Sequence, residues 1–285
     1  MKRGLGARLE QLYTQRCSEP LPVDPVRFCH QVGGNDNQEI VACVSSILAY
    51  GGVSQISKSI SRVLDVTGGE PARFIDNFDF KRELPRFLGI THRFTTGLDL
   101  ALVFVALKAI RQEAGSLENV ARRYAHDGIT AAYDLIHGFS GVVLGLPYTQ
   151  LTNGMVQELP ASFRFLFPTP QSGSACKRMC MMLRWLVRPA DGVDLGLWTM
   201  ISPRQLIVPV DRHIGRISKL LGFTGTDAAT WRNAVRITQA LRTYDVEDPI
   251  KYDFALCHIG ITEGCRGVRG QICSGCPIHK WCTVC

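Results

Sequence analysis

The chain has 285 residues, which is the length of one or two domains. Apolar residues make up 46% of it and charged residues 20%, a balance typical of a protein with a buried core. The longest apolar stretch, residues 98–110, contains two charged side chains and is too short to cross a bilayer. No apolar segment follows the basic residues near the first methionine, so we predict no secretory signal. Composition therefore excludes a collagen-like chain, a membrane protein and a secreted disulfide scaffold, and favours a cytoplasmic protein.

Apolar residues recur at helical spacing along nearly the whole chain. The first clear helix covers residues 36–50, where an Asp–Asn start precedes an apolar run that ends at Gly51 and Gly52. The same criteria predict further helices, in chain order, at 54–66, 71–88 (one helix or two), 97–115, 116–126, 128–139, 174–188, 211–222 and 227–243. A proline-rich connection occupies 145–173, and the clearest strand-like run is the short segment 206–208. The pattern predicts an all-α fold of short helices and short loops.

Positive charge is concentrated in one part of the chain. Residues 164–219 contain nine Lys and Arg residues against three Asp and Glu residues, whereas residues 1–150 are nearly balanced. A concentrated basic segment attracts polyanions, and nucleic acid is the first candidate. Charge alone is about equally compatible with a basic surface that has no such partner.

Six of the eleven cysteines lie in the last 29 residues. In a reducing compartment, clustered cysteines bind metal more often than they form disulfides. Four of them have the spacing C-x7-C-x2-C-x5-C: Cys265, Cys273, Cys276 and Cys282. A zinc site usually pairs two C-x2-4-C knuckles and this tail has one, so the spacing favours a [4Fe–4S] cluster, with zinc as the alternative. Cys257 and Cys285 are spare and could replace one of the four.

Two residues of the basic segment are candidates for catalysis. Asp211 follows a Pro–Val pair and is a natural N-cap for the helix predicted at 211–222. A capping carboxylate is fixed and ionised, which suits it to stabilise an oxocarbenium-like sugar or to activate a nucleophile, although an N-cap needs no catalytic role. Lys177 lies near a predicted helix start beside Arg178, where the helix dipole and the neighbouring charge favour the free amine that Schiff-base chemistry needs. Its alternative role is to contact a phosphate.

Three segments resemble the helix-hairpin-helix (HhH-GPD) superfamily of DNA glycosylases. Residues 209–217, Pro-Val-Asp-Arg-His-Ile-Gly-Arg-Ile, are similar to its P-V-D-x-H-x-x-R-I segment. Residues 173–177, Gly-Ser-Ala-Cys-Lys, are similar to its G-x-G-x-K hairpin end, with Ala175 in place of the second glycine. The cysteine tail is similar to the iron–sulfur loop of endonuclease III, whose first gap has six residues rather than seven.

The overall resemblance is closest to an uncharacterised bacterial family of that superfamily, over most of residues 36–260. The insert at 191–198 is also similar to the archaeal 8-oxoguanine DNA glycosylases. The resemblance implies the superfamily's fold of two helical lobes. The implied division of the chain is a helical lobe with the hairpin at 36–206 and a second lobe at 1–35 and 207–285, with the cluster loop at 265–282.

The same resemblance implies that Lys177 and Asp211 form the catalytic pair. The expected activity is removal of a damaged base, such as an oxidised purine, from double-stranded DNA, followed by strand cleavage at the abasic site. We expect a monomer that acts in the bacterial nucleoid. The alternatives are a glycosylase without lyase activity and a non-catalytic iron–sulfur protein that binds DNA. An electron-transfer protein is disfavoured, because it leaves the pair and the basic segment unexplained.

The hairpin and the basic segment supply the expected substrate contacts. DNA contacts are predicted for Gly173, Ser174, Arg178, Arg184, Arg212 and Arg216. Three aromatic residues are candidates for filling the gap left by a flipped base or for stacking on that base: Tyr50, Trp185 and Trp198. Packing within the protein is the alternative for Tyr50 and Trp185.

If the four tail cysteines hold a [4Fe–4S] cluster, protein purified without oxygen should be brown and contain about four irons per chain. Replacing any one of the four by Ala should lower the iron content and destabilise the tail, because each thiolate is a ligand. Cys17→Ala, outside the tail, should retain the iron. Stoichiometric zinc without iron, measured by elemental analysis, would contradict the prediction.

Overall fold

The computed structural model describes residues 3–19, 21 and 24–284. This described part is built of helices and loops without a β-strand, and its strand-like pairings are two isolated bridges, His92–Thr95 and Ser174–Thr230. The predicted all-α class is therefore confirmed. The strand-like run at 206–208 lies between a 3-10 turn and a helix and pairs with no strand there. None of the helices in these residues has the length and apolar character needed to pass through a membrane.

The helices follow the predicted order, with four α-helices that the sequence did not predict. The α-helices of the described residues are α1 Leu5–Ser18, α2 Asn35–Ile47, α3 Val53–Thr67, α4 Pro71–Asp76, α5 Phe80–Phe87, α6 Gly97–Ala114, α7 Leu117–Arg122, α8 Ala131–Gly145, α9 Tyr148–Leu151, α10 Ala161–Leu166, α11 Lys177–Val187, α12 Arg212–Leu220, α13 Trp231–Arg242 and α14 Asp253–Ile261. Their 3-10 helices are η1 Pro25–Gln31, η2 Pro170–Ser172, η3 Pro203–Gln205, η4 Gln271–Gly275 and η5 His279–Trp281. The sequence did not predict α1 or α14, and it left α9 and α10 within the proline-rich connection.

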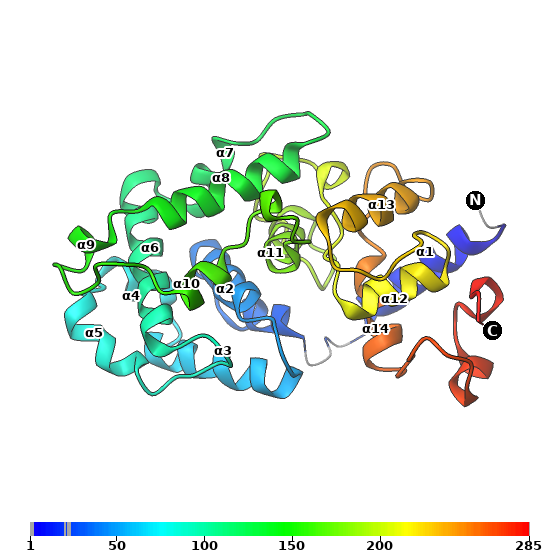
Figure 1. Ribbon diagram of the computed structural model, residues 1–285, viewed down its shortest axis with the longest axis horizontal. Coiled ribbons are helices and arrows are strands. Elements are labelled where there is room, and N and C mark those ends of the chain that lie inside the picture. Colours follow the sequence, from blue (N-terminus) through cyan, green and yellow to red (C-terminus); the bar gives the residue numbers. More distant parts are fainter. Residues whose placement is uncertain (1–2, 20, 22–23, 285) are drawn as a thin grey trace.

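The helices form two groups at the two ends of an elongated molecule, with α11 between them (Figure 1). In the first group, α4, α5 and α7 pack against α6, and α2 packs against η1 and α11. In the second group, α14 packs against both α1 and α12, so the start and the end of the chain lie together. The 3-10 helix η1 contacts α2 and α3 in the first group, although the predicted division placed residues 1–35 in the second lobe.

The first group is centred on α6, which is buried on most of its sides. Thr96 caps this helix in a capping box with Asp99, and residues 99–107 are all buried. A helix that is apolar around its whole circumference belongs in the centre of a bundle. The end of α5 touches the start of α6 so closely that a Cβ atom on Gly97 would lie 2.0 Å from Phe87 O. Only glycine fits at this crossing.

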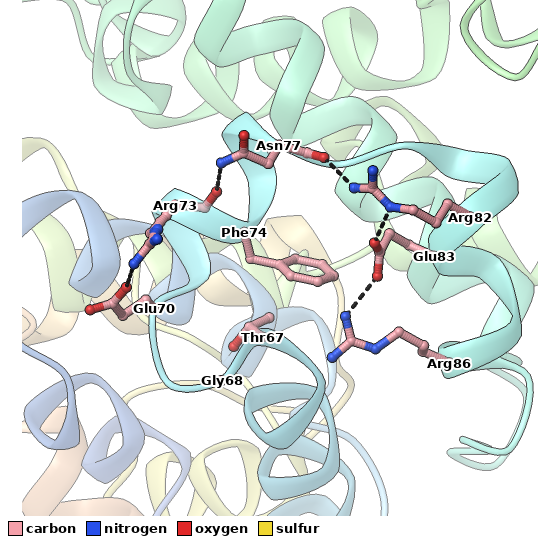
Figure 2. Close-up of a pocket in the computed structure, with 9 residues that line it drawn as sticks. All are labelled: Thr67, Gly68, Glu70, Arg73, Phe74, Asn77, Arg82, Glu83 and Arg86. Atoms are coloured by element: carbon pink, nitrogen blue, oxygen red, sulfur yellow. Dashed lines mark hydrogen bonds and ion pairs between the residues drawn. The ribbon is translucent and has the colours of Figure 1, made fainter.

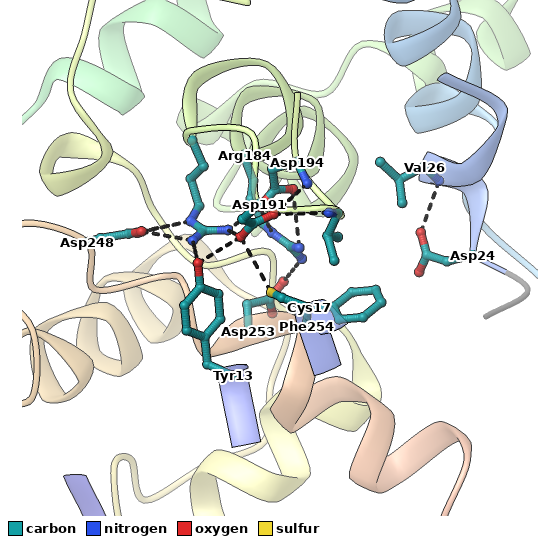
Figure 3. Close-up of polar contacts among 12 residues, drawn as sticks. Tyr13, Cys17, Asp24, Val26, Arg184, Asp191, Asp194, Asp248, Asp253 and Phe254 are labelled. Atoms are coloured by element: carbon teal, nitrogen blue, oxygen red, sulfur yellow. Dashed lines mark hydrogen bonds and ion pairs between the residues drawn. The ribbon is translucent and has the colours of Figure 1, made fainter. Parts of the chain in front are cut away.

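Arg184, on α11, ties this helix to the second group through buried ion pairs (Figure 3). Its Nη1 donates to Asp253 Oδ2 on α14 at 2.7 Å, and its Nε donates to Asp194 Oδ2 at 3.2 Å. These three side chains are at most 6% exposed. Burial raises the pKa of Asp253 to about 6, and the nearby guanidinium of Arg184 opposes this rise. The ion pair therefore compensates charges that the fold has removed from water.

Arg188, one turn further on and immediately after the end of α11, extends the same network. Its Nε donates to Asp248 Oδ2 at 2.9 Å, and its Nη1 donates to Asp191 Oδ2 at 2.9 Å and also to Asp194. Tyr13 of α1 donates to Asp191 Oδ2 at 2.9 Å, so the first helix is tied to the same cluster (Figure 3). Two guanidinium groups thus face four carboxylates, which together connect α1, α11 and α14.

Arg184→Met should lower the free energy of unfolding by about 3–5 kcal/mol, because it leaves Asp194 and Asp253 buried with fewer counter-charges. Arg73→Met is the matched control. Arg73 pairs with Glu70 at the surface, where the two side chains are 81% and 61% exposed, and such pairs contribute about 0.5 kcal/mol or less. Urea denaturation near neutral pH measures both changes. Equally small losses in the two variants would show that the buried network does not hold α11 to the second group.

Candidate active site

Lys177 and Asp211 are 34 residues apart in the chain and meet at the starts of two helices. Lys177 is the first residue of α11, and Asp211 immediately precedes α12. The Nζ atom of Lys177 lies 3.5 Å from Asp211 Oδ2. The lysine side chain is 32% exposed and the aspartate side chain 19%, so solvent reaches both. The two residues that the sequence predicts as a pair therefore form a partly exposed ion pair.

The two carboxylate oxygens of Asp211 have different partners. Oδ1 accepts hydrogen bonds from the backbone N–H groups of His213 at 2.8 Å and Ile214 at 2.9 Å, which confirms the predicted N-cap. Oδ2 faces Lys177. Burial raises the pKa of Asp211, but the Lys177 ammonium and the capping amides outweigh burial and hold the pKa below its usual value. Asp211 is therefore an ionised carboxylate with one oxygen directed at an amine.

The loop before α11 is fixed by left-handed backbone and by local hydrogen bonds. Gly173 and Cys176 have φ angles of 79° and 46°. Ser174 Oγ accepts a hydrogen bond from Cys176 N at 3.2 Å, and Gly173 O accepts one from Trp231 N at 3.0 Å. The loop is thus attached to the start of α13, and it places Lys177 at the first position of α11. Gly173 is exposed and Ser174 partly exposed, as a DNA contact would require.

The four arginines predicted to contact DNA differ in their exposure. Arg212 is exposed and Arg216 is partly exposed, both on α12. Arg178 is 7% exposed, and its Nη1 donates to Ile47 O at 3.1 Å. Arg184 is 3% exposed and belongs to the buried ion pairs of α11. The predictions for Arg178 and Arg184 are wrong, because their donors bond to groups inside the protein and cannot reach a phosphate.

The two tryptophans predicted to stack on a base are also buried. Trp185 is 1% exposed and Trp198 is 2% exposed. Trp198 Nε1 donates to Glu39 Oε1 at 2.7 Å, so its polar group is satisfied within the core. Both predictions are wrong, because packing between helices has enclosed these rings.

Exposed aromatic side chains gather around Tyr50. The Tyr50 hydroxyl donates to His92 O at 2.8 Å, which holds the ring in place. Its ring stacks with Phe94 at a centroid distance of 6.5 Å and meets Phe165 edge-on at 5.2 Å. Phe94 is 63% exposed and Phe165 is 44% exposed. The Arg178 guanidinium lies over both the Tyr50 and the Phe165 rings, so this aromatic cluster adjoins the start of α11.

The sequence analysis did not identify Phe94 or Phe165. Helical periodicity cannot find Phe94, because it lies in the loop between α5 and α6. A signal was nevertheless present, since Phe94 is the one large apolar side chain in the polar segment 91–96. An apolar ring without apolar neighbours in sequence is a candidate for an exposed contact residue.

The C-terminal tail is attached to the start of α1 and the end of α12. Arg8 Nε donates to Pro277 O at 2.9 Å, and Thr283 N donates to Leu220 O at 3.0 Å. Earlier in the tail, Gly267 packs directly against the Arg216 side chain of α12. The tail therefore lies against the helix that begins at Asp211.

The four tail cysteines, Cys265, Cys273, Cys276 and Cys282, lie in this same C-terminal segment. Cys276 N donates to Cys273 O at 3.2 Å, so these two share one turn. Burial raises the pKa of Cys276, and the nearby groups of Cys265 and Cys282 raise it further. Among the residues that the structure describes, no three His, Cys, Asp or Glu side chains stand in an arrangement that could hold a metal ion. Cys285 lies outside the described residues.

A cavity of about 290 Å³ opens between α3, α4 and α5 (Figure 2). Its lining residues are Thr67, Gly68, Glu70, Arg73, Phe74, Asn77, Arg82, Glu83 and Arg86. Each arginine here is paired, since Arg73 bonds to Glu70, and Arg82 and Arg86 both bond to Glu83. None of the predicted site residues lines this cavity, so we place the candidate site at Lys177 and Asp211.

Comparison with known proteins identifies the family by sequence. A family model described as "Protein of unknown function (DUF2400)" matches residues 24–262. This match includes Lys177, Asp211 and α14, and it ends before the four tail cysteines. No curated protein matches the chain, and no solved structure matches it.

Asp211→Ala should lower the free energy of unfolding near pH 7 by about 1 kcal/mol because α12 loses its cap, whereas Asp211→Asn should lose less because Asn caps comparably. The folded state holds the pKa of Asp211 below its unfolded value. The carboxylate therefore contributes stability above about pH 4, and this contribution is lost as the pH falls through the folded-state pKa. Urea denaturation at several pH values measures this. The difference in unfolding free energy between the unmodified protein and Asp211→Asn should therefore shrink in acid. A difference that does not shrink would contradict the stabilising role assigned to the Asp211 carboxylate.

Proposed function

The chain belongs to the family described as "Protein of unknown function (DUF2400)", and we propose that it is a DNA glycosylase with an associated lyase activity. Its substrate would be double-stranded DNA that contains a damaged base, for which an oxidised purine is the first candidate. Lys177 would act as the nucleophile and Asp211 as the carboxylate that assists it.

The observation that carries this proposal is the 3.5 Å separation between Lys177 Nζ and Asp211 Oδ2. Catalysis needs groups that a substrate can reach and that are held in one orientation. Here both side chains are partly exposed, one carboxylate oxygen is held by backbone amides, and the other remains directed at the amine. An amine next to a fixed, ionised carboxylate is an arrangement suited to covalent catalysis at a sugar carbon.

The proposed reaction begins with attack of the unprotonated Lys177 amine on C1′ of the sugar. The N–C1′ bond forms as the bond from C1′ to the base breaks, and the electron pair leaves with the base, which takes up a proton from water. Positive charge develops on the sugar, and ionised Asp211 stabilises it. The attached nitrogen then loses one proton, the sugar ring opens as the C1′–O4′ bond breaks and O4′ takes up a proton, and a protonated imine results. Loss of a C2′ proton to water then expels the 3′-phosphate.

The surface around the pair supports a nucleic-acid partner. Arg212 and Arg216 are accessible on α12 beside Asp211 and are suited to contact phosphates. Phe94 and Phe165 present exposed rings next to Tyr50, which Arg178 links to the start of α11, and exposed rings stack on unpaired bases. Flipping a base costs a few kcal/mol, which such stacking would offset.

We propose a [4Fe–4S] cluster in the tail, because four thiols with the spacing C-x7-C-x2-C-x5-C lie in one segment and Cys276 has two of the others nearby. We propose Cys265, Cys273, Cys276 and Cys282 as its ligands, with zinc as the alternative. When bound, the cluster would supply a structural cross-link. Through Gly267 and Arg216, that cross-link would steady the surface of α12.

Lys177→Ala should abolish the covalent adduct that borohydride traps on lesion-containing duplexes, because the attacking amine is gone. Asp211→Asn should retain DNA binding and the fold, and its rate should fall by about 10² or more because the stabilising charge is lost. Lys219→Ala is the matched control, since Lys219 is an exposed lysine on α12. A panel of single-lesion duplexes, incubated with and without borohydride, measures the activity of each variant.

Each other outcome of this experiment has a definite meaning. Base excision that survives Lys177→Ala without any trapped adduct would identify a glycosylase without lyase activity. Full activity in both Lys177→Ala and Asp211→Asn would place the chemistry elsewhere. DNA binding without base excision by the unmodified protein on any duplex would leave a DNA-binding protein and overturn the proposal.

A further inference from the structure

Cys257, on α14, lies behind the catalytic candidates. Its Sγ is 3.9 Å from Asp211 Oδ2, the same oxygen that Lys177 Nζ approaches at 3.5 Å. The distance is within the range of a hydrogen bond from a thiol. The helices α12 and α14 are in close contact, since a Cβ atom on Gly260 would lie 2.5 Å from the His213 ring. This contact fixes the position of Cys257 relative to Asp211.

The surroundings of Cys257 keep it protonated. Burial raises the pKa of the thiol well above its usual value, and the carboxylates of Asp211 and Asp253 raise it further. Asp253 stands one turn earlier on α14, with its Oδ1 buried and without a hydrogen-bond partner among the described residues. The titratable groups that face Cys257 or Asp211 are Lys177 of α11, His213 of α12, Asp253 of α14 and Asp24 before η1. Between two carboxylates, the thiol serves as a donor and not as a nucleophile.

The partners of Asp211 Oδ2 would change during the proposed reaction. Oδ1 is held throughout by the backbone amides of α12. Oδ2 faces the Lys177 ammonium in the resting protein, but the amine must give up its proton before it attacks a sugar. At that point the thiol is the donor that still faces this oxygen.

We propose that Cys257 is a positioning residue, whose S–H group donates to Asp211 Oδ2 and holds this carboxylate in place while Lys177 changes its charge. The inference rests on the proposed function, because it assigns a role within that reaction. It also accounts for a cysteine that the sequence left spare, since Cys257 contacts the candidate active site.

Cys257→Ala should raise the pKa of Asp211, because it removes a donor to the ionised form. The acid limb of the trapping rate should therefore move to higher pH, with trapping about threefold to tenfold slower on that limb, as expected for a weak donor to a charged group. Cys257→Ser keeps a donor and should restore most of the rate. NMR titration of the Asp211 carboxyl group gives the same shift independently of activity.

Cys17→Ala is the matched control, because Cys17 Sγ lies 3.6 Å from Asp191 Oδ2 in the ionic network and away from Lys177. It should leave the Asp211 titration and the trapping profile unchanged. If the unmodified protein traps DNA, and Cys257→Ala changes neither this trapping nor the Asp211 titration, this inference alone is overturned. Absence of trapping from the unmodified protein would overturn the proposed function instead. If Cys257→Ala slows trapping equally at every pH and Cys257→Ser does not restore the rate, Cys257 has a packing role and the proposed hydrogen bond is overturned.

Discussion

Arg184 of α11 and Arg188 at its end face a cluster of four carboxylates, two of them buried, and these contacts attach the second helix group to α11. Charges removed from water are costly unless they are paired, so the network restricts how α11 can sit between the groups. Lys177 stands two turns before Arg184 on the same helix. The ion pairs that attach α11 to the second group are therefore made by the same helix that carries Lys177.

The candidate site uses the unsatisfied N–H groups that every helix leaves at its start. Asp211 satisfies two of those groups in α12, and this capping role fixes its carboxylate in one orientation. The loop before α11 achieves a comparable result with backbone geometry, because its left-handed residues place Lys177 at the first helical position. The two helix starts, one capped by Asp211 and one preceded by left-handed backbone, thus place the carboxylate and the amine next to each other.

α14 connects the structural network with the site. Asp253, in its first turn, pairs with Arg184, and Cys257, in the next turn, contacts Asp211. Any shift of this helix would change both contacts together. This coupling explains how the buried ion pairs can influence the environment of the proposed chemistry, although they touch no solvent.

Local chemistry in the sequence determined the all-α class, most of the helix boundaries and the N-cap at Asp211, because these depend on residues within a few positions of one another. Pairing of Lys177 with Asp211 was predicted through a resemblance, and neither spacing nor periodicity could have supplied it. The sequence could not distinguish a basic residue at the surface from a buried one, so Arg178 and Arg184 were assigned to DNA.

Only the tertiary structure decided that those two arginines are buried, that Trp185 and Trp198 are buried, and that Cys257 contacts Asp211. Their surroundings are made by segments far apart in the chain: Arg184 meets Asp253 across 69 positions, and Trp198 meets Glu39 across 159. Helical periodicity reports which face of a helix is apolar, but not which distant carboxylate or ring will cover it. Burial and charge pairing are properties of the folded chain, and they appear only when the helix groups are packed together.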